Sequence, residues 1–194
     1  MKTQMTSIRA LLVGSTLLAS SAVLAQTAAA PVAAPTAAPA AAGPTDPQIA
    51  AIVVAANSVD VEAGKLAKSR SKNKAVKAFA ETMIRDHEGV NKQAKALVTK
   101  LKVKPEENAT SKSLTEGGKE NLAALKKLKG AEFDKAYVAH EVTYHEQVIA
   151  AVTTVLMPNV KNEELKALLE KSAPVFTAHL EHAKKLSGEL AEAK

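Results

Sequence analysis

The 194-residue chain is predicted to fold as an all-α, antiparallel four-helix bundle, with one extra short helix in the connection between the second and third long helices. Phe, Trp and Tyr make up only 3% of the residues, whereas strands favour aromatic and β-branched side chains. Ala, Leu, Lys and Glu are abundant, and all four are good helix formers. Four long segments also carry apolar residues at the three- and four-residue spacing of an amphipathic helix.

The absence of cysteine excludes disulfide scaffolds, cysteine-ligated zinc, iron–sulfur clusters and covalent c-type haem. Any metal site must therefore use histidine, carboxylate or carbonyl ligands. The formal charge is +6 and falls to +4 without Lys2 and Arg9, and the other lysines are dispersed among glutamates. This mild, scattered charge predicts no nucleic-acid partner.

Residues 1–25 are predicted to be a secretory signal peptide. Lys2 and Arg9 form a basic start, residues 10–18 are apolar, and Val23-Leu24-Ala25 resembles a cleavage site. The apolar run is short of the ~20 residues that span a bilayer, so an uncleaved anchor is the lesser alternative. We therefore expect export to the periplasm or cell envelope, with membrane contact only through this segment if it is not cleaved.

Residues 26–46 are predicted to be a disordered linker rich in Ala and Pro, followed by a helical domain over residues 47–194. Pro31, Pro35 and Pro39 recur at a spacing that blocks helix continuation. The segment is either a tether that spaces the domain from another element or a leader left after processing.

The first long helix is predicted to begin at Asp46-Pro47, an N-cap acceptor followed by proline in the first turn. Its apolar stripe runs to about Leu66, and the polar residues 69–73 form a tight connection. The second helix is predicted over residues 74–101 and ends before Pro105.

Residues 106–130 are polar, contain Gly117-Gly118, and are predicted to hold one short helix closed by Gly130. The third long helix follows over residues 131–157. Because the second and third long helices are joined by this longer crossing, the short helix lies outside the simple hairpin pattern.

Pro158-Asn159 is predicted to turn the chain into the fourth long helix, over residues 163–191. Pro174 lies inside that helix, where proline removes a donor and clashes with the preceding turn. We expect a kink there, or a restart with Ser172 as the cap.

Three histidines on the apolar stripes of three different helices are the candidate functional residues: His87, His145 and His179. Buried imidazoles need partners for both ring nitrogens. The three rings are therefore either separate core residues, each bonded to a neighbouring carboxylate or carbonyl, or a converging set that binds a divalent metal ion or forms a hydrogen-bonded polar layer. Counting along the helices leaves His145 and His179 ~7.5 Å apart in height. Glu62 is the candidate fourth ligand, with a larger mismatch of ~10 Å, and Glu141 is placed to orient His145.

Two similarities to known metal motifs do not hold. His140 and His145 are five residues apart, whereas the zinc-protease helix needs a spacing of four. No histidine has a glutamate three residues before it, so the di-iron carboxylate motif is absent. His179 and His182 are three apart and could share a metal ion, although His182 is expected at the surface.

Three stretches of the chain resemble an exported bacterial family, the domain of unknown function 4142, over about residues 47–186. The stretches are Val76-Lys77-Ala78-Phe79-Ala80-Glu81-Thr82-Met83-Ile84-Arg85-Asp86-His87, Phe133-Asp134-Lys135-Ala136-Tyr137-Val138 followed by His145, and Ala173-Pro174-Val175-Phe176-Thr177-Ala178-His179-Leu180. The resemblance implies a ferritin-like helical bundle of the cell envelope, without an assigned reaction. The family pattern is similar at Asp86-His87, at His145, at Pro174 to His179 and at Glu62, and does not include His140 or His182.

The sequence leads to three functional hypotheses. The first is an exported, non-enzymatic or activity-unassigned bundle with an interior site at His87, His145 and His179, acting with an unidentified envelope partner. The second is a metal-dependent oxidoreductase or metal-storage protein that uses the same residues with Glu62. The third is a structural or partner-binding bundle held on the Ala/Pro linker.

Overall fold

The computed structural model describes residues 43–192, so the predicted signal peptide and most of the predicted linker lie outside the described residues. Within that range the chain is helical and contains no strand, which confirms the all-α prediction. The elements are α1 (Asp46–Arg70), α2 (Lys74–Lys100), α3 (Ala109–Lys127), α4 (Gly130–Ala151), the π-helical turn η1 (Val152–Leu156), α5 (Met157–Asn159) and α6 (Glu163–Glu192).

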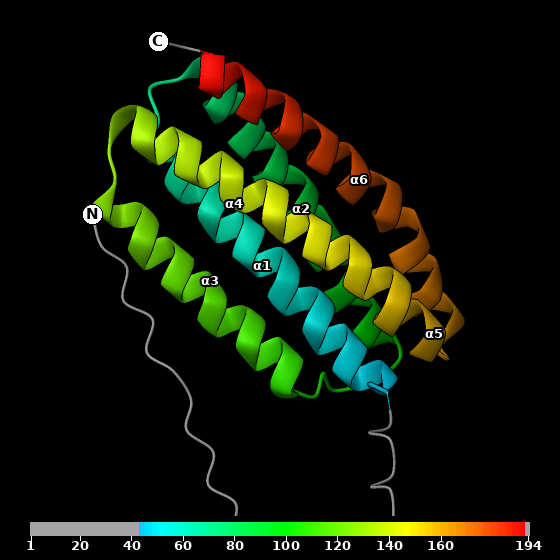
Figure 1. Ribbon diagram of the computed structural model, residues 1–194. Coiled ribbons are helices and arrows are strands. Elements are labelled where there is room, and N and C mark those ends of the chain that lie inside the picture. Colours follow the sequence, from blue (N-terminus) through cyan, green and yellow to red (C-terminus); the bar gives the residue numbers. More distant parts are fainter. Residues whose placement is uncertain (1–42, 193–194) are drawn as a thin grey trace, which may run out of the picture. The chain divides into compact units, whose positions relative to one another are not determined.

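The four long helices α1, α2, α4 and α6 pack around one core. Helix α1 packs against α2 and α4, and α6 packs against the same two helices from the other side. Helix α3 lies outside this set along α1, with a smaller contact to α4 (Figure 1). The predicted four-helix bundle with an additional helix in the crossing is therefore present.

Side chains at the helix starts satisfy backbone groups that have no partner within the helix. Thr45 rather than Asp46 is the cap of α1, and its N–H donates to Gln48 Oε1 at 3.2 Å. The carboxylate of Asp46 instead accepts the N–H groups of Lys161 and Asn162 at 2.9 and 3.0 Å. The first helix is thereby attached to the start of the last one.

Helix α3 is longer than the predicted short helix, because it begins directly after its cap, Asn108, and continues for 19 residues to Lys127. Gly130 does not close it. Gly130 has a positive φ of 56° and begins α4 instead. Gly118 allows α3 to approach α1, since a Cβ there would lie 2.7 Å from Val59 Cγ2.

The turn before α6 lies later than predicted. Pro158 and Asn159 are helical residues of α5, and the chain reverses over residues 160–162. Pro174 does not interrupt α6, so the predicted restart is wrong. Ser172 does not cap a new helix, because its hydroxyl donates to the Leu168 carbonyl one turn back at 2.8 Å.

The interior consists of two apolar clusters separated by a polar layer. One cluster, toward the ends of α2 and α6 that carry Val76 and Leu190, includes Phe79, Met83, Phe133, Tyr137 and Leu186. The other includes Ile49, Val90, Leu97, Leu165 and Phe176. Each long helix crosses from one cluster to the other through buried polar residues, which form the polar layer: Asn57, Asp60, His87, Glu141, His145 and His179.

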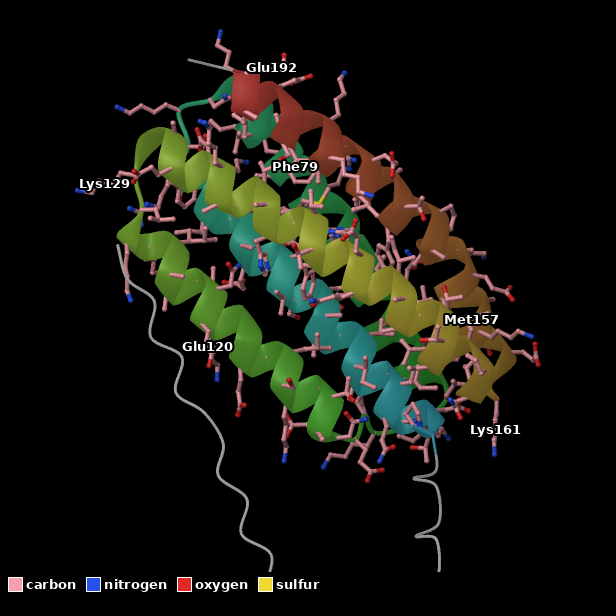
Figure 2. All side chains as sticks on the ribbon, in the orientation of Figure 1. Phe79, Glu120, Lys129, Met157, Lys161 and Glu192 are labelled. Carbon is pink, nitrogen blue, oxygen red and sulfur yellow. The ribbon has the colours of Figure 1, made fainter. Side chains whose placement is uncertain are left out.

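Charged side chains cover the outside of the bundle. Glu120, Lys129 and Lys161 extend away from the helices (Figure 2), and each is exposed. No helix within residues 43–192 is both long enough and apolar enough to cross a membrane.

Candidate metal centre

His87, His145 and His179 meet in the middle of the bundle. Their side chains are 2%, 1% and 5% exposed. The ring centroid of His87 lies 5.5 Å from that of His145 and 5.1 Å from that of His179. The centroids of His145 and His179 are 5.5 Å apart. One ring nitrogen of each lies within 4.8 Å of the others, so the three residues form one cluster, called here the histidine centre.

The later turn before α6 explains why the predicted mismatch in height is not found. Counted from the end of α5 at Asn159 and the start of α6 at Glu163, His145 and His179 differ by about two residues. At 1.5 Å per residue this is ~3 Å rather than ~7.5 Å. The two rings can therefore face each other across the α4–α6 hairpin.

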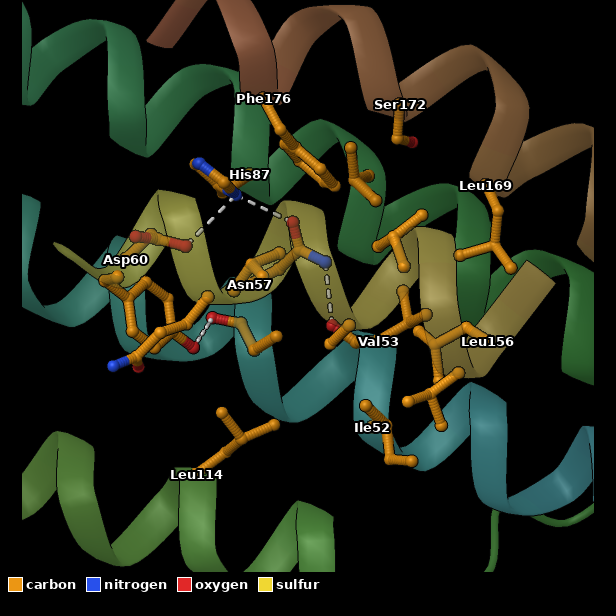
Figure 3. A pocket seen from close by; sticks show the side chains of 18 of the residues that line it. Ile52, Val53, Asn57, Asp60, His87, Leu114, Leu156, Leu169, Ser172 and Phe176 are labelled. Carbon is orange, nitrogen blue, oxygen red and sulfur yellow. Dashed lines mark hydrogen bonds and ion pairs between the residues drawn. The ribbon is translucent and has the colours of Figure 1, made fainter. Parts of the chain in front are cut away.

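The tautomer of His87 is set by an amide on α1. Asn57 Nδ2 donates to the Val53 carbonyl at 2.7 Å, which leaves Asn57 Oδ1 facing His87 Nδ1 at 2.7 Å. An amide oxygen only accepts hydrogen bonds, so Nδ1 of His87 carries the proton. Figure 3 shows the contacts of this ring with Asn57 and Asp60, and its Nε2 is left with a lone pair.

The other two rings are fixed by the same logic. His145 Nδ1 lies 2.9 Å from the Glu141 carbonyl, an acceptor, so it is the donor and Nε2 is free of hydrogen. His179 Nε2 lies 3.0 Å from Asp86 Oδ2. A neighbouring hydrogen bond from Arg85 lowers the pKa of Asp86, and the ionised carboxylate accepts from His179 Nε2. His179 Nδ1 is then the bare nitrogen.

The three bare nitrogens are buried atoms without a hydrogen-bond partner among the described residues: His87 Nε2, His145 Nε2 and His179 Nδ1. Leaving a buried polar atom unsatisfied costs about 1–3 kcal/mol. A metal ion 2.0–2.1 Å from each nitrogen would bring the three to ~3.4 Å from one another, a contraction on the order of 1 Å. Neutral imidazole suits zinc, copper, iron and nickel. The donor set therefore fits a transition-metal ion.

An acidic side chain lies behind each ring of the histidine centre. Asp86 lies 3.0 Å from His179, Asp60 lies 3.4 Å from His87, and Glu141 lies 3.5 Å from His145, measured from carboxylate oxygen to the protonated ring nitrogen. Metal-bound histidines commonly donate their second N–H to a carboxylate or a carbonyl, which fixes the ring and strengthens the ligand. All three rings have this arrangement.

Burial keeps the three imidazoles in the neutral form that binds metal. Desolvation lowers the pKa of His145 from 6.5 to about 4. Desolvation and the proximity of the other two histidines lower the pKa of His87 well below its usual value, and desolvation also lowers the pKa of His179. The ligands therefore need not lose protons at neutral pH before an ion binds.

Asp60 and Glu141 are buried together beside the histidine centre. Desolvation raises the pKa of Glu141 from 4.5 to about 8, and desolvation with the neighbouring Glu141 raises the pKa of Asp60 well above its usual value. Asp60 Oδ1, both Glu141 oxygens and the Tyr137 hydroxyl have no hydrogen-bond partner by geometry within the described residues. This carboxyl pair holds protons at neutral pH and could release them when a cation enters.

The structure does not bring Glu62 to the histidine centre. Its side chain is 58% exposed and pairs with Lys65 at 3.4 Å on the outside of α1. The sequence predicted that Glu62 lies at the edge of the apolar stripe of the first helix. Asp60, two residues earlier, faces the interior, and two residues correspond to a rotation of ~200° around the helix, so Glu62 points to the outside. Asp60 and Glu141 with His145 form the second cluster that could hold a metal.

The remaining histidines lie outside both clusters. His140 is half-buried and stacks on Tyr144 at 5.4 Å. His182 is exposed, as expected, and its ring meets Phe79 edge-on at 5.0 Å. The spacing of three residues between His179 and His182 therefore does not create a shared site in the described part of the chain.

Sequence reasoning missed Asn57 and Asp60 as members of the site. Both lie on the face of α1 that also carries Val53, Ala56 and Gly64, one turn apart from one another. The sequence pattern that could have predicted their burial is a stripe of small residues that includes Asn and Asp. Short side chains let two helices approach closely and bury a polar group between them.

The fold and the site define a class: an all-α bundle whose core is divided by a buried three-histidine centre. The chain belongs to the family described as Domain of unknown function (DUF4142), whose model matches residues 30–186. This confirms the family resemblance drawn from the three sequence stretches. No curated protein matches the chain, and no solved structure matches it.

Proposed function

We propose that this protein binds one divalent transition-metal ion per chain at the histidine centre. One observation carries the proposal: a ring nitrogen of each histidine lies within 4.8 Å of the other two, and each ring keeps one buried nitrogen without a partner while its other nitrogen donates to an oxygen. Histidines that only fill a core would need acceptors or donors on both nitrogens. Metal ligation supplies the missing partner to all three at once.

The three-ligand set leaves room for a further ligand on the ion, a feature of sites that exchange or use their metal. A store or carrier for a single ion and a metal-dependent oxidoreductase would both use this centre. Asp60 and Glu141 lie beside the protonated nitrogens of His87 and His145, and Asp86 bonds to that of His179, which supports a role for these carboxyl groups in orienting the ligands.

Metal titration tests the proposal. The chain is purified without a tag, stripped with a chelator and titrated with Zn²⁺ and Co²⁺, with metal content measured by mass spectrometry. We expect one equivalent to bind the wild type and to raise its melting temperature, since an ion that binds only the folded state stabilises it. The His145→Ala variant should lose this binding.

His140→Ala is the matched control, because His140 lies on the same helix but outside both clusters. It should bind metal as the wild type does, and circular dichroism should show that both variants are folded. Failure of the wild type to bind zinc, cobalt, copper, iron or manganese would overturn the proposal. Equal loss in the two variants would do the same, and would favour a structural or partner-binding bundle.

We also infer that the chain is exported to the periplasm or cell envelope, where an unidentified partner would meet it. Lys2, Arg9, the apolar residues 10–18 and Ala25 support a cleaved signal peptide. The intact mass of protein from the periplasmic fraction should correspond to a chain that begins at Gln26. Full-length protein in the cytosol, or held in the membrane, would contradict cleavage and export.

A further inference from the structure

A cavity of about 230 Å³ lies next to the histidine centre, bounded by α1, α2, α3, α4, η1 and α6. Most of its wall is aliphatic, with the aromatic rings of Tyr144 and Phe176. Six of the residues that line it are Ile52, Val53, Leu156, Leu168, Leu169 and Phe176. The cavity belongs to the second apolar cluster and is separate from the space between the three bare nitrogens.

One end of the cavity is polar and the rest is not. His87, Asn57 and Asp60 line the end nearest the histidine centre, whereas Ile52, Leu156 and Leu169 lie farther along the pocket (Figure 3). At this end His87 Nδ1 contacts both Asn57 Oδ1 and Asp60 Oδ2, whereas Asp60 Oδ1 and His87 Nε2 have no hydrogen-bond partner among the described residues. The remaining wall offers almost no hydrogen bonds.

Three exposed residues in the lining mark the way in. Thr110 belongs to α3, Gln147 to α4 and Val155 to η1, so the opening lies between α3 and the α4–η1 segment. Val155 is 42% exposed, and within residues 43–192 no other large hydrophobic side chain is exposed.

The π-helical turn η1 shapes the cavity. Val152, Val155 and Leu156 all come from this turn and all line the space. A π-turn is rare, because it inserts an extra residue into an α-helix, and it recurs at functional sites. Here it occurs in the part of the helix that faces the cavity, although the rest of α4 is a regular α-helix.

We propose that this cavity binds a small, uncharged, largely hydrocarbon molecule beside the histidine centre. A dry apolar cavity of ~150 Å³ accommodates benzene, so 230 Å³ suits a molecule of about nine non-hydrogen atoms at the same density. A peptide helix is far too wide, at ~10 Å or more. The lining contains no Lys or Arg, and Asp60 already faces His87, so a charged ligand would be buried without a partner.

Binding of three monosubstituted benzenes tests the proposal, because they are close in size and differ in charge. Benzyl alcohol, benzylammonium and benzoate are titrated into the full chain and followed by calorimetry and by ligand-observed NMR. We expect benzyl alcohol to bind with a Kd of about 1 mM or below, as a compact ligand of this size can. The two ions should bind at least ~10-fold more weakly.

Neighbouring alanines on α4 provide a matched pair of variants. Ala151 is half-buried and lines the cavity, whereas Ala150 is exposed and does not. Ala151→Phe should fill the space and weaken benzyl alcohol binding by ~10-fold or more, whereas Ala150→Phe should change it less than ~2-fold. If Ala151→Phe does not fold, Leu114→Phe fills the cavity from α3 instead.

The measurements are made on metal-free protein and repeated with metal, so the result does not depend on the proposed metal function. No binding of benzyl alcohol by the wild type would overturn the proposal. Equal binding of the ions, or equal binding by the filled and control variants, would also overturn it. Binding that is present without metal and lost on filling establishes the site even if the histidine centre binds no ion.

Discussion

Replacing Glu141 by glutamine is expected to stabilise the metal-free protein at neutral pH. Glu141 is fully buried in α4, and desolvation raises the pKa of its carboxyl from 4.5 to about 8. At pH 7 the folded chain therefore keeps a proton on this group that the unfolded chain has released. Glutamine resembles the protonated carboxyl in shape but does not titrate, so it adds no pH dependence to the free energy of unfolding.

The size of the effect follows from the pH interval over which the two states differ. A group whose pKa is raised on folding contributes stability that is complete below the unfolded pKa and is lost as the pH rises toward the folded pKa. Between pH 4.5 and pH 7 the free energy of unfolding of the wild type falls by ~1.4 kcal/mol per pH unit, or by about 3 kcal/mol in total. Glu141→Gln avoids this loss, so its advantage should be near zero at pH 4.5 and about 3 kcal/mol at pH 7.

Urea unfolding with a chelator present, at pH 4.5 and at pH 7, measures both values. Glu146→Gln is the control on the same helix, since Glu146 is half-exposed and pairs with Lys184 at the surface. It should change stability by less than ~1 kcal/mol at either pH. The reasoning would be refuted if Glu141→Gln destabilised the protein at pH 7, or shifted its stability equally at both pH values.

Further predictions concern helix packing, the apolar core and the hydrogen bond that holds the His179 ring. Gly118→Ala should destabilise the fold by ~1–3 kcal/mol in chemical unfolding, because the new methyl group would lie 2.7 Å from a side chain of α1, whereas Gly117→Ala faces open space and should stabilise it by up to ~1 kcal/mol. Phe79→Ala should cost ~3–5 kcal/mol in the same assay, since its side chain is completely buried. Asp86→Ala should weaken metal binding in a competition titration by ~10–100-fold, because it removes the acceptor that holds His179.

The fold could be predicted largely because each long helix has its own apolar stripe. The same stripes carry His87, His145 and His179, so the spacing alone indicates that these three side chains face the interior. The exact turns were harder to predict, because Pro158 and Pro174 normally break helices. Here both lie within helical segments, where packing against neighbouring helices outweighs the local preference.

The site was predicted only in part, since a periodic pattern gives the face of a helix but not its rotation to within one residue. Glu62 and Asp60 differ by two positions, and only Asp60 is buried. Only the partner of His145, Glu141, lies on the same helix; the bonds that set the tautomers of His87 and His179 join residues 30 and 93 positions apart on different helices. No spacing rule within one helix could reveal them.

The position of α3 at the outside of the bundle has a consequence for how the molecule opens. Only Ser111, Gly118 and Leu125 of its 19 residues are buried, so little apolar area holds it in place. Segments of this kind detach at a small free energy while the remainder stays folded. We expect the amide hydrogens of α3 to exchange with solvent well before those of α2 and α6. Such partial opening would admit solutes to the interior without global unfolding.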